Sequence, residues 1–132
     1  MRITADTNVL LRALVGDDEA QQRTAVDTLE AAETVAVSSQ SLCELCWVLA
    51  RGYRTARADI AAAIRGLLAT SNIVIDRPAV EAGLAVLEAG GDFADGVIAH
   101  EGRWLGGETF VSFDVQAVRL LGEAGLAARL LT

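Results

Sequence analysis

Short apolar segments alternate along the chain with segments whose apolar residues recur at helical spacing. The short segments are bounded by turn residues and have the length of strands buried on both faces. They cover residues 2–5, 34–38, 72–75, 109–113 and 126–131. Between them, the spacing of Ile60, Ile64, Leu67 and Leu68 is typical of the buried side of a helix.

Strands that alternate with helices form a mostly parallel sheet with helices on both of its faces. The pattern therefore predicts an α/β protein. At 132 residues, the chain is expected to form one domain, residues 1–132. Ligands of such sheets bind beyond the carboxyl ends of the strands, so functional residues are expected directly after each strand.

The composition is typical of a folded domain, with 52% apolar and 22% charged residues. The longest uncharged stretches, 34–43 and 66–75, contain ten residues each and are too short to cross a membrane. The first residues, MRITADTNVLLR, lack the basic, apolar and small-residue order of a signal peptide. We therefore expect a cytoplasmic protein without membrane contact.

The net charge is −7, and all eleven basic residues are arginine. The negative total argues against a broad electrostatic attraction to nucleic acid. The absence of lysine excludes working response-regulator receivers and haloacid-dehalogenase phosphatases, because both cluster aspartates at strand ends but rely on a lysine. An acidic metal site remains compatible with this composition, since bound cations would offset part of the charge.

Cys43 and Cys46 form a C-x-x-C motif, which occurs in redox pairs and in halves of zinc sites. The chain contains no second pair and only one histidine, and both cysteines lie within a predicted helix. We interpret them as small side chains that are buried in the core or in an interface.

Acidic residues from separate segments are expected at one edge of the sheet. Asp6 directly follows the first strand, Glu44 lies in the helix after the second strand, and Asp114 ends the fourth strand. Asp92 and Asp95 open the helix that precedes the fourth strand. Because the carboxyl ends of parallel strands meet at one edge, these side chains are predicted to converge.

The helix that begins near Asp92 is predicted to turn its two aspartates away from the core. At about 100° per residue, Asp92 and Asp95 share one side of this helix with small residues. Another side carries the apolar stripe that we expect to be buried, which consists of Ala94, Val97, Ile98 and Leu105.

Each acid also has an ordinary structural explanation. Asp6, Asp92 and Asp114 could cap helix N-termini, and Glu44 could be an exposed helix residue. Their common position at one sheet edge favours a shared site, in which carboxylates repel one another unless a cation lies between them. Hard oxygen ligands suit Mg²⁺ or Mn²⁺. Such a cation supports phosphodiester hydrolysis, which the sequence therefore predicts.

Four segments, ADTNVLLR, SLCELCWVL, DFADGVIA and SFD, resemble a PIN domain in their order and spacing, in particular the small bacterial toxin ribonucleases of VapC type. The resemblance spans nearly the whole chain. It implies a three-layer α/β/α sandwich around a parallel sheet of about five strands. It further implies a Mg²⁺- or Mn²⁺-dependent endoribonuclease that leaves a 5′-phosphate and a 3′-hydroxyl. Such toxins usually form homodimers and are inhibited by an antitoxin encoded alongside.

The resemblance also implies roles for individual residues. The family's acidic quartet, which would hold the metal, corresponds to Asp6, Glu44, Asp95 and Asp114. Asp92 matches an additional acid that often precedes the third member of the quartet. Asn8 and Ser112 match polar residues that would orient the ligands or the scissile phosphate.

A local basic rim beside this site would help an acidic protein to bind RNA. Its candidate members are Arg12, Arg51, Arg54 and Arg57, which could alternatively form an ordinary solvated helix surface.

Two other functions also remain open. The first is a PIN nuclease that acts on DNA or in RNA processing without a toxin role, and the second is a non-catalytic nucleic-acid-binding module. The intact quartet argues against the second.

Overall fold

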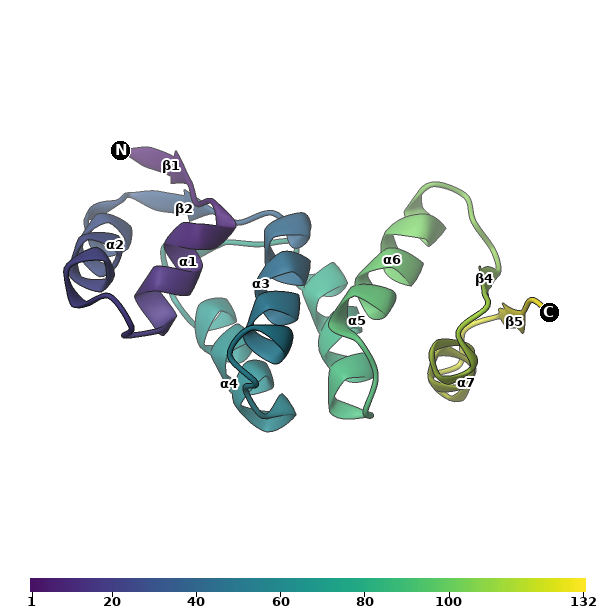
Figure 1. Cartoon of the computed structure of the whole chain (residues 1–132). Coiled ribbons are helices and arrows are strands. Elements are labelled where there is room, and N and C mark those ends of the chain that lie inside the picture. The colour runs from purple at the N-terminus through teal and green to yellow at the C-terminus, as the bar shows by residue number, and fades with distance from the viewer. The chain divides into compact units, whose positions relative to one another are not determined.

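The computed structural model describes residues 1–132, which divide into two compact units, Met1–Asp76 and Arg77–Thr132 (Figure 1). Seven helices and five strands alternate along the chain, and every strand pairs in parallel. The predicted α/β class is therefore confirmed, and each predicted strand segment contains a strand. Three of the strands lie in the first unit and two in the second. The single domain over residues 1–132 stays a prediction.

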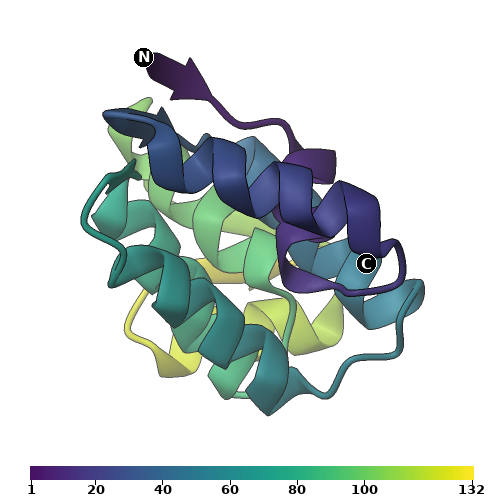
Figure 2. The same ribbon diagram turned by 90° about the vertical axis from the view of Figure 1, so that its left-hand side faces the viewer.

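The first unit contains a parallel three-stranded sheet in the order β1-β2-β3, formed by Arg2–Thr4, Thr34–Ala36 and Ile73–Val74. Val35 in the central strand lies opposite Ile3 on one side and Ile73 on the other. The helices of this unit are α1 (Thr7–Leu14), α2 (Glu19–Ala31), α3 (Ser39–Arg51) and α4 (Arg57–Leu68). Figure 2 views this unit with α2 and α4 in front.

Local sequence explains why these helices begin where they do. The Asp18 carboxylate accepts a hydrogen bond from the Gln21 amide at the start of α2, and the Ser38 hydroxyl accepts one from the Ser41 amide at the start of α3. Such caps satisfy amides that have no partner within the helix. Beyond the cap, α3 buries Leu42, Leu45, Cys46 and Leu49. This spacing places them on one side of the helix.

The second unit contains α5 (Arg77–Glu88), α6 (Phe93–Trp104), β4 (Phe110–Ser112), α7 (Val115–Glu123) and β5 (Ala128–Leu130). Strands β4 and β5 pair in parallel, with Phe110 opposite Ala128 and Ser112 opposite Leu130. Part of the core of this unit consists of Val86, Ala99, Leu120 and Leu121, with Phe110, Leu126 and Ala128 packed against it.

The predicted core stripe of α6 is partly wrong. Ile98 and Leu105 are 56% and 89% exposed. The buried residues of this helix are Phe93, Gly96, Val97 and Ala99. The helix therefore turns a side that includes a glycine, and not its most apolar stripe, toward the core.

Close packing between α5 and α6 explains this orientation. A Cβ atom at Gly96 would overlap the carbonyl oxygen of Ala82, and one at Gly83 would overlap the ring of Phe93. Glycine at both positions lets the two helices approach each other more closely than side chains would permit. Hydrophobic periodicity is read from apolar side chains, so a glycine does not contribute to it. In this helix, however, glycine determines which side packs against α5.

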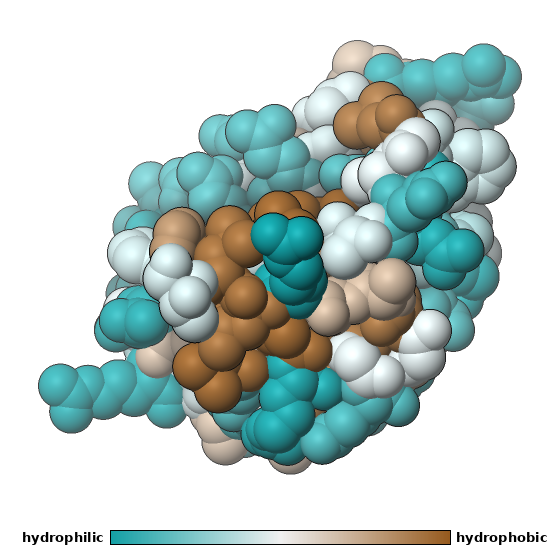
Figure 3. Space-filling model, turned by 90° about the vertical axis from the view of Figure 1, so that its right-hand side faces the viewer, coloured by the Kyte–Doolittle hydropathy of each residue, from teal (hydrophilic) through white to brown (hydrophobic).

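Exposed apolar side chains in the second unit lie around β4 and at the end of α6. Phe113 and Val115 follow β4, and Trp104 and Leu105 end α6; all four are exposed. Figure 3, which views the structure from the side of β4 and β5, shows apolar side chains gathered among charged ones. No helix of the structure combines the length and the apolar character needed to cross a membrane.

Replacing Gly96 by alanine should destabilise the protein, because the added methyl group overlaps the backbone of α5. We expect a loss of roughly 1–3 kcal/mol in the free energy of unfolding, measured by urea titration. Gly102→Ala is the matched control in the same helix, because a Cβ atom there meets nothing within 4 Å. It should leave stability unchanged or raise it by up to about 1 kcal/mol. Equal effects of the two substitutions would contradict the close helix contact.

Candidate active site

Asp6 connects the end of β1 to the start of α1. Its backbone is extended, with φ −72° and ψ 156°, and its carboxylate accepts a hydrogen bond from the Thr7 amide at 2.9 Å. This contact uses Oδ1, and the residue is exposed. Asp6 therefore caps α1 while its second carboxylate oxygen remains available to a ligand.

Glu44 lies in α3 and is joined to the start of α1 by a side-chain hydrogen bond. The Thr7 hydroxyl donates to Glu44 Oε2 at 2.7 Å. Thr7 itself is buried, whereas Glu44 is exposed. A single threonine thus contacts two of the predicted site residues, Asp6 through its amide and Glu44 through its hydroxyl.

Asp95 is partly buried in the first turn of α6 and lies near two other carboxylates. Its pKa is raised above 3.8, first by desolvation and then by the negative charges of Asp92 and Asp114. Both causes disfavour the ionised form. Asp92 precedes α6 at its N-cap position, but its side chain makes no capping hydrogen bond. The second unit therefore brings Asp92, Asp95 and Asp114 into electrostatic contact. Their common role in a site stays a prediction.

Asp114 follows β4 and caps α7, where its Oδ1 accepts a hydrogen bond from the Ala117 amide at 3.1 Å. The Asp114 amide donates to the Ser112 hydroxyl oxygen at 2.9 Å. Because Ser112 accepts in this contact, its hydroxyl proton remains able to donate elsewhere. Ser112 thus lies beside Asp114, and its role in a site stays a prediction.

The predicted acids fall into two groups, Asp6 with Glu44 in the first unit and Asp95 with Asp114 in the second. No three histidine, cysteine or acidic residues lie in an arrangement that could hold a metal. The donors nevertheless fit a hard divalent cation, because they are carboxylate oxygens and no arginine forms an ion pair with any of the four. Their shared use as metal ligands remains a prediction.

Arg12, a predicted member of the basic rim, is held by a neighbouring acid. Its guanidinium donates to Asp17 at 2.8 Å, and the Tyr53 hydroxyl donates to the other oxygen of the same carboxylate at 2.8 Å. The hydrogen bond from Tyr53 and that from Arg12 lower the pKa of Asp17, while Asp17 raises the pKa of Tyr53. This pairing reduces the charge that Arg12 could offer to a phosphate.

The other rim candidates differ in their local setting. Arg51 is exposed near the end of α3, and Arg54 is exposed in the following loop with φ 51°. Asn8 and Arg12 line a hollow between α1 and α2 of ≈ 360 Å³. Asn8 follows Asp6, the first acid of the quartet, by two positions. It is exposed, as a role in orienting a phosphate requires.

The two cysteines behave as the sequence indicated. Cys46 is buried in α3, and desolvation raises the pKa of its thiol to about 12. A thiol with this pKa remains protonated and is a poor nucleophile or metal ligand near neutral pH. Cys43 is partly buried and forms no disulfide. The C-x-x-C motif therefore contributes packing and no evident chemistry.

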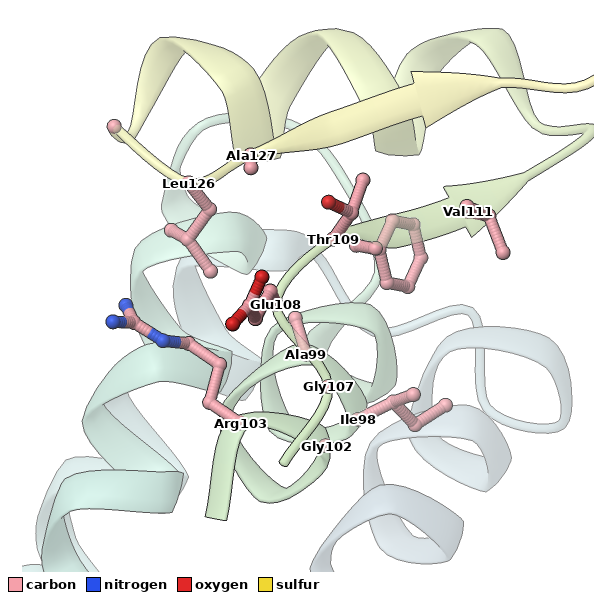
Figure 4. Close-up of a pocket in the computed structure, with 12 residues that line it drawn as sticks. Ile98, Ala99, Gly102, Arg103, Gly107, Glu108, Thr109, Val111, Leu126 and Ala127 are labelled. Carbon is pink, nitrogen blue, oxygen red and sulfur yellow. The ribbon is translucent and has the colours of Figure 1, made fainter. Parts of the chain in front are cut away.

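A second hollow lies within the second unit, between α6, the loop before β4 and the start of β5 (Figure 4). Its volume is ≈ 360 Å³, and Arg103 and Glu108 are the charged residues of its lining. It opens at the amino ends of the two strands, whereas Asp114 follows the carboxyl end of β4. None of the predicted site residues lines it.

Sequence reasoning missed Thr7 and the pair Asp17–Tyr53. The contacts of Thr7 with Glu44 and of Asp17 with Tyr53 join residues 37 and 36 positions apart. Neither spacing belongs to a helix or strand repeat, so no local signal reveals it. The position of Thr7 directly after Asp6 was the one available indication.

Replacing Asp95 by asparagine should stabilise the metal-free protein at pH 7, because it removes a carboxylate that desolvation and two like charges disfavour. We expect a gain of at most about 1 kcal/mol, since solvent screens a partly exposed group. A raised folded-state pKa means that this cost is present above it and disappears as pH falls below the ordinary value of 3.8. Urea unfolding of the wild type and the variant at several pH values measures the difference.

Asp27→Asn is the charge-matched control for that experiment, because it removes an exposed acid of α2. Its unfolding free energy should follow the wild type across the pH range. A stability loss in Asp95→Asn at pH 7 would contradict the repulsion inferred for this group of carboxylates.

Comparison with known families extends these observations to the whole chain. The model of the PIN domain matches residues 3–120, a range that includes all four acids of the predicted quartet. A search of curated proteins finds no match. PIN domains are typically metal-dependent nucleases, in agreement with the carboxylate-rich strand ends described above. Because the match covers most of its length, the chain belongs to the PIN domain family.

Proposed function

We propose that this protein is an endoribonuclease that hydrolyses RNA phosphodiester bonds with Mg²⁺ or Mn²⁺, as the VapC-type toxin of a toxin–antitoxin pair. The observation that carries the proposal is the position of Asp95 beside Asp92 and Asp114, where no arginine neutralises the carboxylates. Such a group is destabilised by repulsion unless a cation binds. A bound cation would offset the repulsion between the carboxylates. This gain would contribute to the affinity of the site for the cation.

Asp6, Glu44, Asp95 and Asp114 are the proposed metal ligands, with Asp92 as an additional acid. When bound, the cation supplies Lewis-acid chemistry to the phosphate and activates water for attack. The capping contacts of Asp6 and Asp114 fix one oxygen of each carboxylate and leave the other for a ligand. No side-chain nucleophile is required.

Polar residues beside these acids would orient the substrate. The Ser112 hydroxyl accepts from the Asp114 amide and keeps its proton for a phosphate oxygen. Asn8 is exposed in the first turn of α1, where its amide group would be available to a phosphate. Arg51, Arg54 and Arg57 are the rim candidates with exposed side chains, whereas Arg12 is engaged by Asp17.

The proposed partners are RNA, a cognate antitoxin and a second copy of the chain, in the cytoplasm. Exposed apolar side chains support the presence of protein partners, because large apolar groups on a surface commonly mark interaction sites. Phe113, Val115, Trp104 and Leu105 are such residues in the second unit. Trp47, 63% exposed on α3, is one in the first unit.

Cleavage of RNA should depend on a divalent cation. Purified protein incubated with a panel of structured RNAs should cleave in Mg²⁺ or Mn²⁺, lose activity in EDTA and regain it when Mn²⁺ is added in excess. The products should carry 5′-phosphates, which ligation to a 3′-hydroxyl acceptor detects. Equal cleavage of DNA of the same sequence would favour a general nuclease without a toxin role, and cleavage in EDTA would reject the metal-dependent reaction.

Replacing Asp6 or Asp95 by asparagine should lower the rate of RNA cleavage at least about 100-fold, because each variant loses a proposed ligand of the cation that stabilises charge at the phosphate. Asp27→Asn, which removes an exposed acid of α2, should cleave at the wild-type rate. Circular dichroism should show intact folds for all three variants. Full cleavage by either of the first two would remove that residue from the mechanism.

A further inference from the structure

Thr7 stands apart from the other polar residues of the chain because it is buried while its neighbours in the candidate site are exposed. Its exposed fraction is 8%, and it is the one polar residue among the buried residues of the structure. Asp6, Asn8 and Glu44 around it are exposed. A buried hydroxyl requires a hydrogen-bond partner, and here that partner is a carboxylate of the proposed quartet.

The hydrogen bond from Thr7 to Glu44 is short and directed. The distance from Thr7 Oγ1 to Glu44 Oε2 is 2.7 Å, which is typical of a hydroxyl that donates to an ionised carboxylate. A threonine hydroxyl has a single proton, so it engages only this oxygen and leaves Oε1 available. The contact therefore fixes the orientation of the carboxylate and leaves its other oxygen able to bind a ligand.

The backbone around Thr7 makes this donor rigid. Thr7 is the first residue of α1, and the amides of Val9 and Leu10 donate to the Asp6 carbonyl oxygen at 3.0 and 3.3 Å. Threonine is also β-branched, which restricts rotation about χ1. Glu44, in contrast, has three rotatable side-chain bonds and lies exposed on α3, so without this donor its carboxylate would sample several rotamers.

We infer that Thr7 is a positioning residue that holds the Glu44 carboxylate in the orientation needed to bind a divalent cation. This inference rests on the proposed function, because it assumes that Glu44 is a metal ligand. Thr7 acts only through Glu44: its amide contact with Asp6 belongs to the backbone and persists whatever the side chain. Partners that orient metal ligands commonly change metal affinity 10- to 100-fold when they are removed.

Substitution of the side chain separates positioning from packing. Thr7→Val keeps the shape and the β-branch but removes the hydroxyl, and Thr7→Ser keeps the hydroxyl but removes the methyl group. Mn²⁺ is titrated into each metal-free protein by calorimetry, well below the melting temperature of every variant. Thr7→Val should bind Mn²⁺ about 10-fold more weakly than the wild type. Thr7→Ser should bind Mn²⁺ within about 3-fold of the wild type, because serine keeps the hydroxyl group that donates the hydrogen bond to Glu44.

Thr70→Val provides the matched control. The Thr70 hydroxyl also donates a short hydrogen bond, to the Gly66 carbonyl oxygen at 2.8 Å, but it lies at the end of α4 and contacts no acid of the quartet. Its loss should leave Mn²⁺ affinity unchanged. An equal decrease in Thr70→Val would show a general effect of lost hydroxyl groups and would overturn the inference.

Failure of this inference differs from failure of the proposed function. If wild-type protein cleaves RNA with Mn²⁺ but Thr7→Val binds Mn²⁺ as tightly as the wild type, the positioning role is wrong and the function stands. If Mn²⁺ affinity falls in Thr7→Val and returns in Thr7→Ser while no variant cleaves RNA, the positioning role stands and the nuclease assignment fails. A loss of affinity in Thr7→Ser as large as that in Thr7→Val would indicate packing and would also overturn the inference.

Discussion

The constraint on which the proposed chemistry depends is the cost of ionising Asp95, which comes first from desolvation and then from repulsion by neighbouring carboxylates. Asp95 is partly buried near Asp92 and Asp114, and desolvation and their charges raise its pKa. A fold selected only for stability would replace one of these acids by an amide or pair it with an arginine. The chain does neither at this position, which supports the proposal that a cation binds there.

Capping and catalysis are not competing explanations for these acids. Asp6 caps α1 and Asp114 caps α7, in each case through one carboxylate oxygen. The cap fixes the side chain relative to the backbone and leaves the second oxygen free to bind. A helix N-terminus also favours a negatively charged side chain at this position. The capping role of these acids is thus compatible with the chemical role proposed for them.

Local patterns predicted the elements well and the contacts between distant residues poorly. Each strand segment and the helix starts at Asp6 and Asp114 follow from apolar runs and capping residues that act within a few positions. The buried side of α6 was predicted wrongly because Gly96 packs against α5, an interaction that depends on the other helix. The link from Thr7 to Glu44 was missed for the same physical reason, since it exists only after α1 and α3 have packed.

The acidic composition fits this arrangement once the arginines are considered one by one. With a net charge of −7, the protein has no broad positive field to attract RNA. Arg12 is largely committed to Asp17 and Tyr53, so the proposed rim depends on Arg51, Arg54 and Arg57. In the proposed function, recognition of a phosphate would therefore come mainly from bound cations and a few directed polar groups. Because a correctly held carboxylate determines how firmly a cation binds, the small hydroxyl of Thr7 has more influence on the proposed site than its size suggests.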